Sequence, residues 1–207
     1  MGKGPGTSPP IPPGHLGIAN IVATFNVGCD LDLLNIYSHL RNTEYNPVIF
    51  KALFLKLKHP RVTCTMYKSG KMIINGAKTF IDSRRGALVI YKVLKAINVP
   101  VCQSIYTVSN IVCYGMLGSP FNLNRFHETH IPGLTTSYNL ELFPGMTIRF
   151  EGTRAILKMF ASGKFFFTGS KTTMEPLALY KLIHPILQNF CRDELPPPSD
   201  NILIHQN

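Results

Sequence analysis

The sequence predicts an α+β protein built from two copies of one unit, each an antiparallel sheet with a helix packed over one face. Three observations support this prediction. The stretch 50–78 recurs as 143–171, runs of alternating residues surround a Ser-Gly-Lys turn in each copy, and each copy is followed by apolar residues at helical spacing. The chain of 207 residues, 45% hydrophobic and 15% charged, is long enough to bury a substantial core.

The two copies match residue by residue at a constant spacing. Three landmarks of the first copy reappear 93 positions later: Phe50 as Phe143, Ser69-Gly70-Lys71 as Ser162-Gly163-Lys164, and Gly76 as Gly169. Upstream, Asn20-Ile21-Val22 reappears 90 positions later as Asn110-Ile111-Val112. Small changes of spacing place insertions in loops and leave the elements aligned. We therefore predict a first repeat at 16–100, a second repeat at 101–191, and flexible tails at 1–15 and 192–207.

The first repeat is expected to contain a strand, a short helix, three strands and a long helix. Alternation at 18–26 predicts a strand with Ile21 and Ala23 on one face. A short amphipathic helix is predicted at 29–41, with Asp30 or Asp32 as its N-cap. Further strands are predicted at 51–58, at 61–67 and after the turn at 68–70. The helix at 82–97 is predicted to pack on the sheet through its apolar residues Leu88, Tyr91, Val93, Leu94 and Ile97.

The second repeat is expected to follow the same order. We predict a strand at 108–114, a short helix at 123–128, the three-strand core, and a final helix at about 175–190. Pro176 suits the first turn of that helix. Pro185 lies deep inside it and is expected to bend it unless a neighbour compensates.

Charge and cysteine usage limit the class of protein. A net charge of +10 and a pI near 9.5 indicate a polyanionic partner, either nucleic acid or an anionic membrane surface. Five cysteines without a CxxC pair fit reduced thiols in the cytosol or nucleus. The uncharged stretch between Lys95 and Arg125 contains polar residues such as Asn98, so we expect a linker and a strand there and no membrane-spanning helix. The Gly- and Pro-rich N-terminus lacks the apolar segment of a secretory signal.

The sequence offers little sign of catalysis, and we predict neither an enzyme nor a cofactor. His127 and His130 lack the cysteine or acidic partners of a metal-site pattern, so we expect ordinary surface histidines. The two Ser-Gly-Lys motifs are explained by their position between strands. No Ser-His-Asp or paired-carboxylate pattern is present.

The sheet face that does not cover helices is predicted to collect a repeated set of side chains. These are Asn20, Val22, Thr65, Tyr67, Ile73 and Asn75, followed by Asn110, Val112, Lys158, Phe160, Phe166 and Thr168. Cations border this face: Lys56, Lys71, Lys78, Arg149, Lys164 and Lys171. Such a surface suits nucleic acid, because cations neutralise phosphates while apolar groups cover base edges. The alternative is that some of the aromatic residues belong to the core of a two-sided sheet.

Several of these motifs resemble the TATA-box-binding protein family. The resemblance spans about 16–191 and includes Asn20-Ile-Val, Glu44-Tyr-Asn-Pro, Asn110-Ile-Val, Glu141-Leu-Phe-Pro-Gly, both Ser-Gly-Lys motifs, and Tyr180 followed by Pro185. It implies a saddle of two quasi-symmetric halves with helices on the convex face, whose concave sheet sits on the widened minor groove of DNA, a mode established for this family. It also implies a nuclear transcription-initiation factor that assembles other factors at A/T-rich promoters.

The resemblance further implies roles for individual residues. The DNA-intercalating wedges would be Phe50 with Tyr67 and Phe143 with Phe160. The minor-groove bases would be contacted by Asn20, Val22, Thr65, Ile73, Asn75, Asn110, Val112, Lys158, Phe166 and Thr168, and the phosphates by the six bordering cations. Partners similar to transcription factors IIB and IIA, together with TBP-associated factors, would contact Glu141, Leu142, Arg84, Arg85, Lys92 and Lys95.

The chain departs from the family pattern at several of these positions. Tyr67 stands in place of a wedge Phe, Thr65 and Lys158 in place of Leu, and Asn75 in place of Thr. These departures leave a second hypothesis open: a divergent paralogue that acts mainly as a protein-interaction module, with weak or altered DNA specificity. A third hypothesis, single-stranded RNA binding on an aromatic sheet, is disfavoured by the spacing of the wedges.

Overall fold

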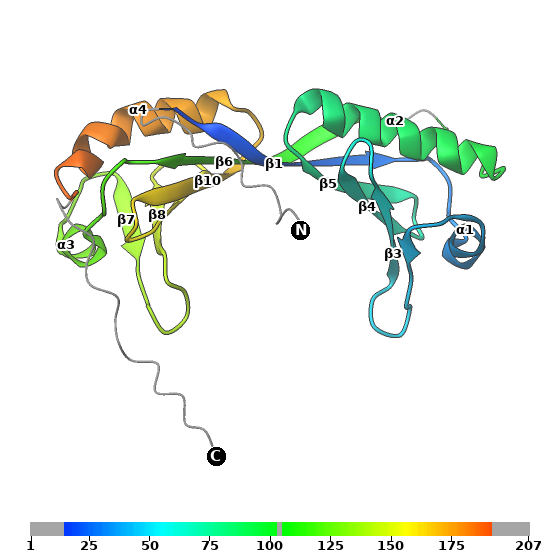
Figure 1. Cartoon of the computed structure of the whole chain (residues 1–207), viewed down its shortest axis with the longest axis horizontal. Coiled ribbons are helices and arrows are strands. Elements are labelled where there is room, and N and C mark those ends of the chain that lie inside the picture. Colours follow the sequence, from blue (N-terminus) through cyan, green and yellow to red (C-terminus); the bar gives the residue numbers. More distant parts are fainter. Residues whose placement is uncertain (1–14, 103–104, 192–207) are drawn as a thin grey trace, which may run out of the picture.

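The computed structural model describes residues 15–102 and 105–191. Within these residues the chain forms one ten-stranded antiparallel sheet, in the order β2-β3-β4-β5-β1-β6-β10-β9-β8-β7. Each half therefore contributes five consecutive strands, and β1 pairs with β6 at the centre. Figure 1 shows the sheet curving into an arch, with α2 and α4 along its outer face and two loops hanging at its open side. The predicted saddle of two repeats is confirmed.

The elements of the two halves correspond one to one. The first half contains β1 (Gly17–Asn26), α1 (Leu33–His39), β2 (Thr43–Glu44), β3 (Ala52–Leu57), β4 (Val62–Tyr67), β5 (Lys71–Ala77) and α2 (Phe80–Ala96). The second half contains β6 (Thr107–Met116), α3 (Leu123–Glu128), β7 (Leu134–Ser137), β8 (Met146–Phe150), β9 (Ile156–Met159), β10 (Lys164–Ser170) and α4 (Met174–Gln188). The predicted strands and helices are present with ends shifted by a few residues. The edge strands β2 and β7 were not predicted, since both are too short to show a clear alternation.

The alternating pattern assigned the two faces of the sheet correctly. Ile21 and Ala23 on β1 are fully buried, as are Leu53 on β3 and Cys64 and Met66 on β4. Their neighbours in sequence lie on the opposite face. The core therefore fills the space between the sheet and the helices of the convex face. We call the other side of the sheet, away from α2 and α4, the concave face.

The prediction for the residues of α2 that pack on the sheet was right for Leu94, which is fully buried, and wrong for Leu88. Ser83, Gly86, Ile90 and Leu94 are buried, whereas Leu88 is 60% exposed. The helix lies so close to β4 that a Cβ on Gly86 would be 2.8 Å from Cγ2 of Val62. Small residues on a helix allow such a close approach, and a search for apolar residues alone does not find them.

The other helices agree better with expectation. Asp32 is the N-cap of α1, and its side chain accepts a hydrogen bond of 3.0 Å from the backbone N–H of Asn35. In α4, Pro176 lies in the first turn and Pro185 lies inside the helix, which continues to Gln188. Among the described helices, none is both long and apolar enough to cross a membrane. The predicted tails lie almost entirely outside the described residues.

Candidate nucleic-acid interface

The centre of the concave face is formed by β1 and β6, which run antiparallel. Asn20 lies opposite Val112, and Val22 lies opposite Asn110. All four residues are half-buried, on the opposite side of the strands from Ile21 and Ile111 of the core. The reciprocal pairing places the pseudo-two-fold axis of the molecule between these strands. The structure thus brings together four side chains that the sequence predicted for one site.

A hydrogen bond to a glycine fixes each of the two asparagines. The backbone N–H of Gly76 donates to Asn20 Oδ1 at 2.7 Å, and that of Gly169 donates to Asn110 Oδ1 at 2.8 Å. Both glycines have positive φ, +96° and +90°, a conformation that glycine adopts readily. Because the side-chain oxygens are occupied, the Nδ2 groups are the atoms left to meet a ligand. Asn110 Nδ2 also donates to Thr168 Oγ1 at 3.1 Å, which uses one of its two hydrogens.

An aromatic pair lies at each outer end of the concave face. The rings of Phe50 and Tyr67 are 6.4 Å apart and nearly perpendicular, and those of Phe143 and Phe160 are 5.7 Å apart in a similar arrangement. Phe50 is 44% exposed and Phe143 is 38% exposed. These are large values for phenylalanine, so the rings are accessible to a ligand.

The first ring of each pair is positioned by a loop of the same construction in both halves. We call residues 45–51 the first stirrup loop and residues 138–145 the second. The N–H of Phe50 donates to the carbonyl of Asn46 at 2.9 Å, and the N–H of Phe143 donates to that of Asn139 at 3.0 Å. These are the two loops that hang at the open side of the arch in Figure 1. The repeated turn therefore places both phenylalanines at equivalent points.

Beside these aromatic pairs the two halves differ. In the first half, Phe54 stacks on Phe50 with ring centroids 5.5 Å apart, and Thr65, opposite Phe54 on β4, is only 7% exposed. In the second half, Lys158 lies opposite both Thr147 and Phe166. Its Nζ is 4.9 Å from the centroid of Phe143 and donates to Thr147 Oγ1 at 2.5 Å. A further aromatic ring thus lies beside Phe50 in the first half, and a cation lies beside Phe143 in the second half.

The six predicted cations are all exposed: Lys56, Lys71, Lys78, Arg149, Lys164 and Lys171. Lys56 forms an ion pair with Glu44 on the neighbouring edge strand. Both side chains of this pair are more than half exposed, so it contributes about 0–1 kcal/mol to stability. A phosphate would displace Glu44 at little cost.

The residues predicted to contact protein partners lie away from the concave sheet. Glu141 and Leu142 are on the second stirrup loop, where Leu142 is 83% exposed. The basic residues of α2 are also exposed: Arg84, Arg85, Lys92 and Lys95.

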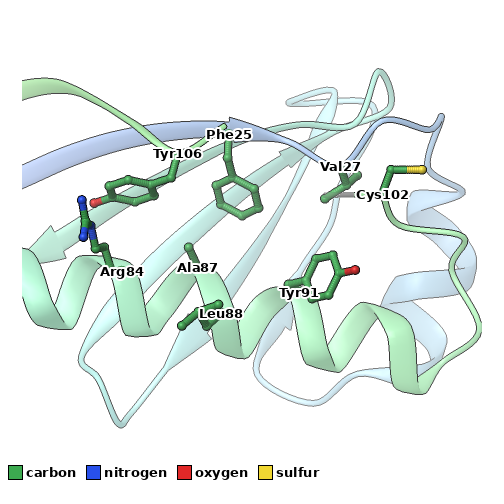
Figure 2. Close-up of a pocket in the computed structure, with 8 residues that line it drawn as sticks. All are labelled: Phe25, Val27, Arg84, Ala87, Leu88, Tyr91, Cys102 and Tyr106. Carbon is green, nitrogen blue, oxygen red and sulfur yellow. The ribbon is translucent and has the colours of Figure 1, made fainter. Parts of the chain in front are cut away.

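Arg84 lines a convex-face cleft of about 460 Å³ between α2, β1 and the linker that precedes β6. Figure 2 shows Phe25, Leu88, Tyr91 and Tyr106 around this cleft. The hydroxyl of Tyr106 donates to Ser83 Oγ at 2.6 Å, and the Arg84 guanidinium lies 6.0 Å from the Tyr106 ring centroid. The linker is therefore attached to α2 beside the basic residues.

Sequence reasoning missed four residues of this site: Phe54, Thr147, Gly76 and Gly169. Alternation along 51–58 puts Phe54 on the same side of the strand as Lys56, but its contact with Phe50 depends on a loop conformation that no pattern reveals. Thr147 follows from Phe54 by the repeat spacing of 93. The signal for the glycines was their recurrence in both copies.

His127 contacts two neighbouring side chains at the surface. The His127 ring lies 2.7 Å from Thr136 Oγ1 and packs edge-on against Tyr138. In the part of the chain that the structure describes, no three His, Cys, Asp or Glu side chains are grouped to hold a metal ion.

Comparison with known proteins identifies the family. A family model described as transcription factor TFIID (or TATA-binding protein, TBP) matches residues 15–97 and 105–190. This chain belongs to the TATA-binding protein family. The predicted resemblance is confirmed, and the two matched segments correspond to the two halves of a TATA-binding protein saddle.

Individual TATA-binding proteins support the same conclusion. The TBP-related factor of Drosophila melanogaster is 36% identical over 176 residues, which cover 85% of this chain and 78% of that protein. The TATA-box-binding protein of Spodoptera frugiperda is also 36% identical over 173 residues, but the matched region is only 56% of its length. The solved structure of Methanococcus jannaschii TBP superposes with a TM-score of 0.73 at 28% identity, covering 84% of this chain and 98% of that one. The chain is thus a transcription factor of this family by sequence and by fold.

Proposed function

We propose that this protein acts in the nucleus, binds double-stranded DNA through its concave face, bends the duplex at the minor groove, and nucleates preinitiation-complex assembly at A/T-rich promoters. The observation that supports this most strongly is the fixed orientation of Asn20 and Asn110. Their oxygens accept from Gly76 and Gly169, which leaves their Nδ2 groups as donors for a ligand at the centre of the saddle, although Thr168 uses one hydrogen of Asn110 Nδ2.

Donors at this place favour A·T base pairs. In the minor groove an A·T pair presents only the acceptors adenine N3 and thymine O2, whereas a G·C pair adds the amino donor of guanine. The Nδ2 groups of asparagine can donate to the acceptors of an A·T pair. In a G·C pair they would meet the amino donor of guanine and be repelled. Val22 and Val112, which alternate with the asparagines across β1 and β6, would pack against the base edges and the sugars.

The aromatic pairs would act as wedges at the two ends of the bound site. Insertion of apolar side chains between base steps unstacks them and kinks the duplex, as in other minor-groove proteins including TATA-binding protein itself. Phe50 with Tyr67 and Phe143 with Phe160 are the pairs available for this role. The bordering cations would contact the phosphates, so binding should weaken steeply with salt.

The decisive experiment uses the full chain and a duplex with fluorophores at both ends. We expect tight, salt-sensitive binding to A/T-rich duplex and a rise in energy transfer as the ends approach. The double variant Phe143→Ala with Phe160→Ala should lose most of both signals. Phe80→Ala is the matched control, because Phe80 is 39% exposed but lies at the start of α2 on the convex side. Unchanged affinity and curvature in the double variant would overturn the proposal.

The protein partners would bind outside the DNA-binding face. A factor similar to transcription factor IIB would contact Glu141 and Leu142, while factors similar to transcription factor IIA and TBP-associated factors would use the exposed basic residues of α2. The test is ternary-complex formation on DNA by the Leu142→Ala variant. Its DNA binding should be unchanged while recruitment of the IIB-like factor falls.

A second candidate function is a protein-interaction module with weak or altered DNA specificity. The observation that favours it is the half-buried Lys158 beside Phe143, together with the almost covered Thr65, at positions where apolar contact with DNA is expected. Binding of general transcription factors without detectable duplex binding at low salt would establish this function in place of the first.

A further inference from the structure

We propose that Lys158 determines the orientation of bound DNA on the saddle, by directing the second repeat to the half-site that contains only A·T pairs. This inference rests on the proposed DNA-binding function. A saddle with two identical halves would bind a duplex equally well in both orientations. Orientation therefore has to come from differences between equivalent residues, since specificity is a difference between two binding free energies.

One such difference on the concave face, which changes the charge, lies beside the wedges. Phe50 and Phe143 are equivalent, but Phe54 is replaced 93 positions later by Thr147, and Thr65 by Lys158. Both pairs occupy matching positions in the sheet, since Phe54 faces Thr65 across β3 and β4, and Thr147 faces Lys158 across β8 and β9. The first half thus has an aromatic ring and a hydroxyl at these two positions. The second half has a hydroxyl and an ammonium group.

The environment of Lys158 shows what it would require from a bound duplex. Its side chain is half-buried, and its Nζ is stabilised by the face of Phe143 at 4.9 Å and by Thr147 Oγ1. If Phe143 inserts between base pairs, the ammonium loses the cation–π contact while DNA also excludes water from it. A desolvated ammonium is costly unless it donates to acceptors.

Base edges next to the wedge decide whether the ammonium can reach acceptors without meeting a donor. A·T pairs offer adenine N3 and thymine O2, to which the ammonium can donate. A G·C pair places the guanine amino donor at the same point and repels the ammonium. Thr65 is different, because a hydroxyl both donates and accepts and the residue is only 7% exposed. The first repeat should therefore tolerate a G·C pair that the second repeat rejects.

Site-directed crosslinking tests this inference. The duplex has one half-site of A·T pairs only and one half-site with a single G·C pair next to the kinked step. Azidophenacyl groups on the phosphates of the A·T-only half crosslink to the full-length protein, and peptide mass spectrometry identifies the attached repeat. We expect crosslinks to the second repeat in about tenfold excess, the effect of one directly read base pair.

Variants at equivalent positions separate the role of charge from that of fold. Lys158→Leu should reduce the excess to a nearly equal mixture, and Lys158→Arg should retain it. Thr65→Leu, at the equivalent position, should also retain it, whereas Thr65→Lys should abolish it by making both halves cationic. A Lys158→Leu protein that binds duplex and keeps the excess would overturn the inference, as would an equal mixture with the unmodified chain. Absence of any duplex binding would instead overturn the proposed function itself.

Discussion

The side-chain oxygen of Asn110 accepts a hydrogen bond of 2.8 Å from the backbone N–H of Gly169, and the equivalent pair of Asn20 and Gly76 repeats this contact at 2.7 Å. Both hydrogen bonds prevent the side-chain amides from flipping, because a flipped amide would point its own N–H donors at the glycine N–H. The saddle thereby holds two donors in a fixed direction before any ligand binds. Preorganisation of this kind lowers the entropic cost of binding.

Asn110→Asp is expected to separate folding from recognition. The aspartate retains an oxygen for Gly169 but loses the Nδ2 donors and adds a negative charge where the base edges would lie. We expect little change in the free energy of unfolding and an affinity for A/T-rich duplex at least about tenfold lower, measured by fluorescence anisotropy. Asn35→Asp, with the same charge change on the distant α1, should bind like the unmodified chain. Equal affinities for all three proteins would contradict this role of Asn110.

Gly169 is also expected to be essential for stability. Its φ is +90°, and a Cβ would lie 2.3 Å from the carbonyl oxygen of Arg154. Gly169→Ala should therefore lower the free energy of unfolding by about 3 kcal/mol or more, since backbone strain and a steric clash add. Gly152 is the matched control, because it has φ of +74° but nothing within 4 Å of its Cβ position. Gly152→Ala should cost only about 1–2 kcal/mol of strain. Denaturant titration that gives equal losses would show that the clash is relieved.

Much of the fold could be predicted because the sequence contains the same unit twice. Alternation in β1, β3 and β4 sorted core from surface, and the repeat spacing carried the assignment into β6, β8 and β9. The equivalence of Phe50 and Phe143 followed from the same repeat spacing. Each of these inferences used only local periodicity or duplication, which are properties of the sequence itself.

The features that escaped prediction depend on contacts between distant segments. The packing face of α2 is set by Gly86 against Val62, a close approach that apolar spacing does not encode. The stacking of Phe54 on Phe50 and the position of Lys158 over Phe143 depend on strand register together with the turn of each stirrup loop. Alternation places a residue on a face but does not identify the neighbour it contacts there.

Stability should fall at alkaline pH because of the buried thiol of Cys64. Burial raises its pKa from the ordinary value of about 9 to about 12. Between these values the unfolded chain has released a proton that the folded chain still holds, so the free energy of unfolding decreases as pH rises. The contribution is absent below about pH 9 and grows to about 2 kcal/mol near pH 10.5, at about 1.4 kcal/mol per unit.

Urea titrations at pH 8 and pH 10.5 measure this effect, and the variant Cys64→Ala is its control. The variant should be less stable at pH 8, because it loses the packing of the thiol, but should show a shallower decline with pH. Burial also raises the pKa of Cys113 and of Tyr138, so some decline should remain. A decline of equal steepness in both proteins would exclude Cys64 as its main cause.

The N-termini of the two long helices are stabilised differently, and this predicts different losses of stability for variants of the two N-cap threonines, Thr79 and Thr173. Thr79 caps α2: its Oγ1 accepts from the N–H of Asp82 at 3.0 Å and donates to the Asp82 carboxylate at 2.8 Å. Thr173, at the start of α4, makes no side-chain cap bond. Thr79→Ala should therefore cost about 1 kcal/mol of stability, whereas Thr173→Ala should change it by less than about 0.5 kcal/mol.

In the second half a buried serine, Ser170, lies just before α4 and is 1% exposed. Its Oγ lies 2.6 Å from Glu175 Oε2 and 2.9 Å from the carbonyl of Thr172. Ser170→Ala would remove the one hydroxyl donor that these two acceptors share and should cost about 1–3 kcal/mol, more than either threonine variant. Thermal and urea unfolding of the three variants should rank them Ser170→Ala, Thr79→Ala, Thr173→Ala in decreasing loss. A loss for Thr173→Ala as large as that for Thr79→Ala would show that α4 is capped at Thr173 after all.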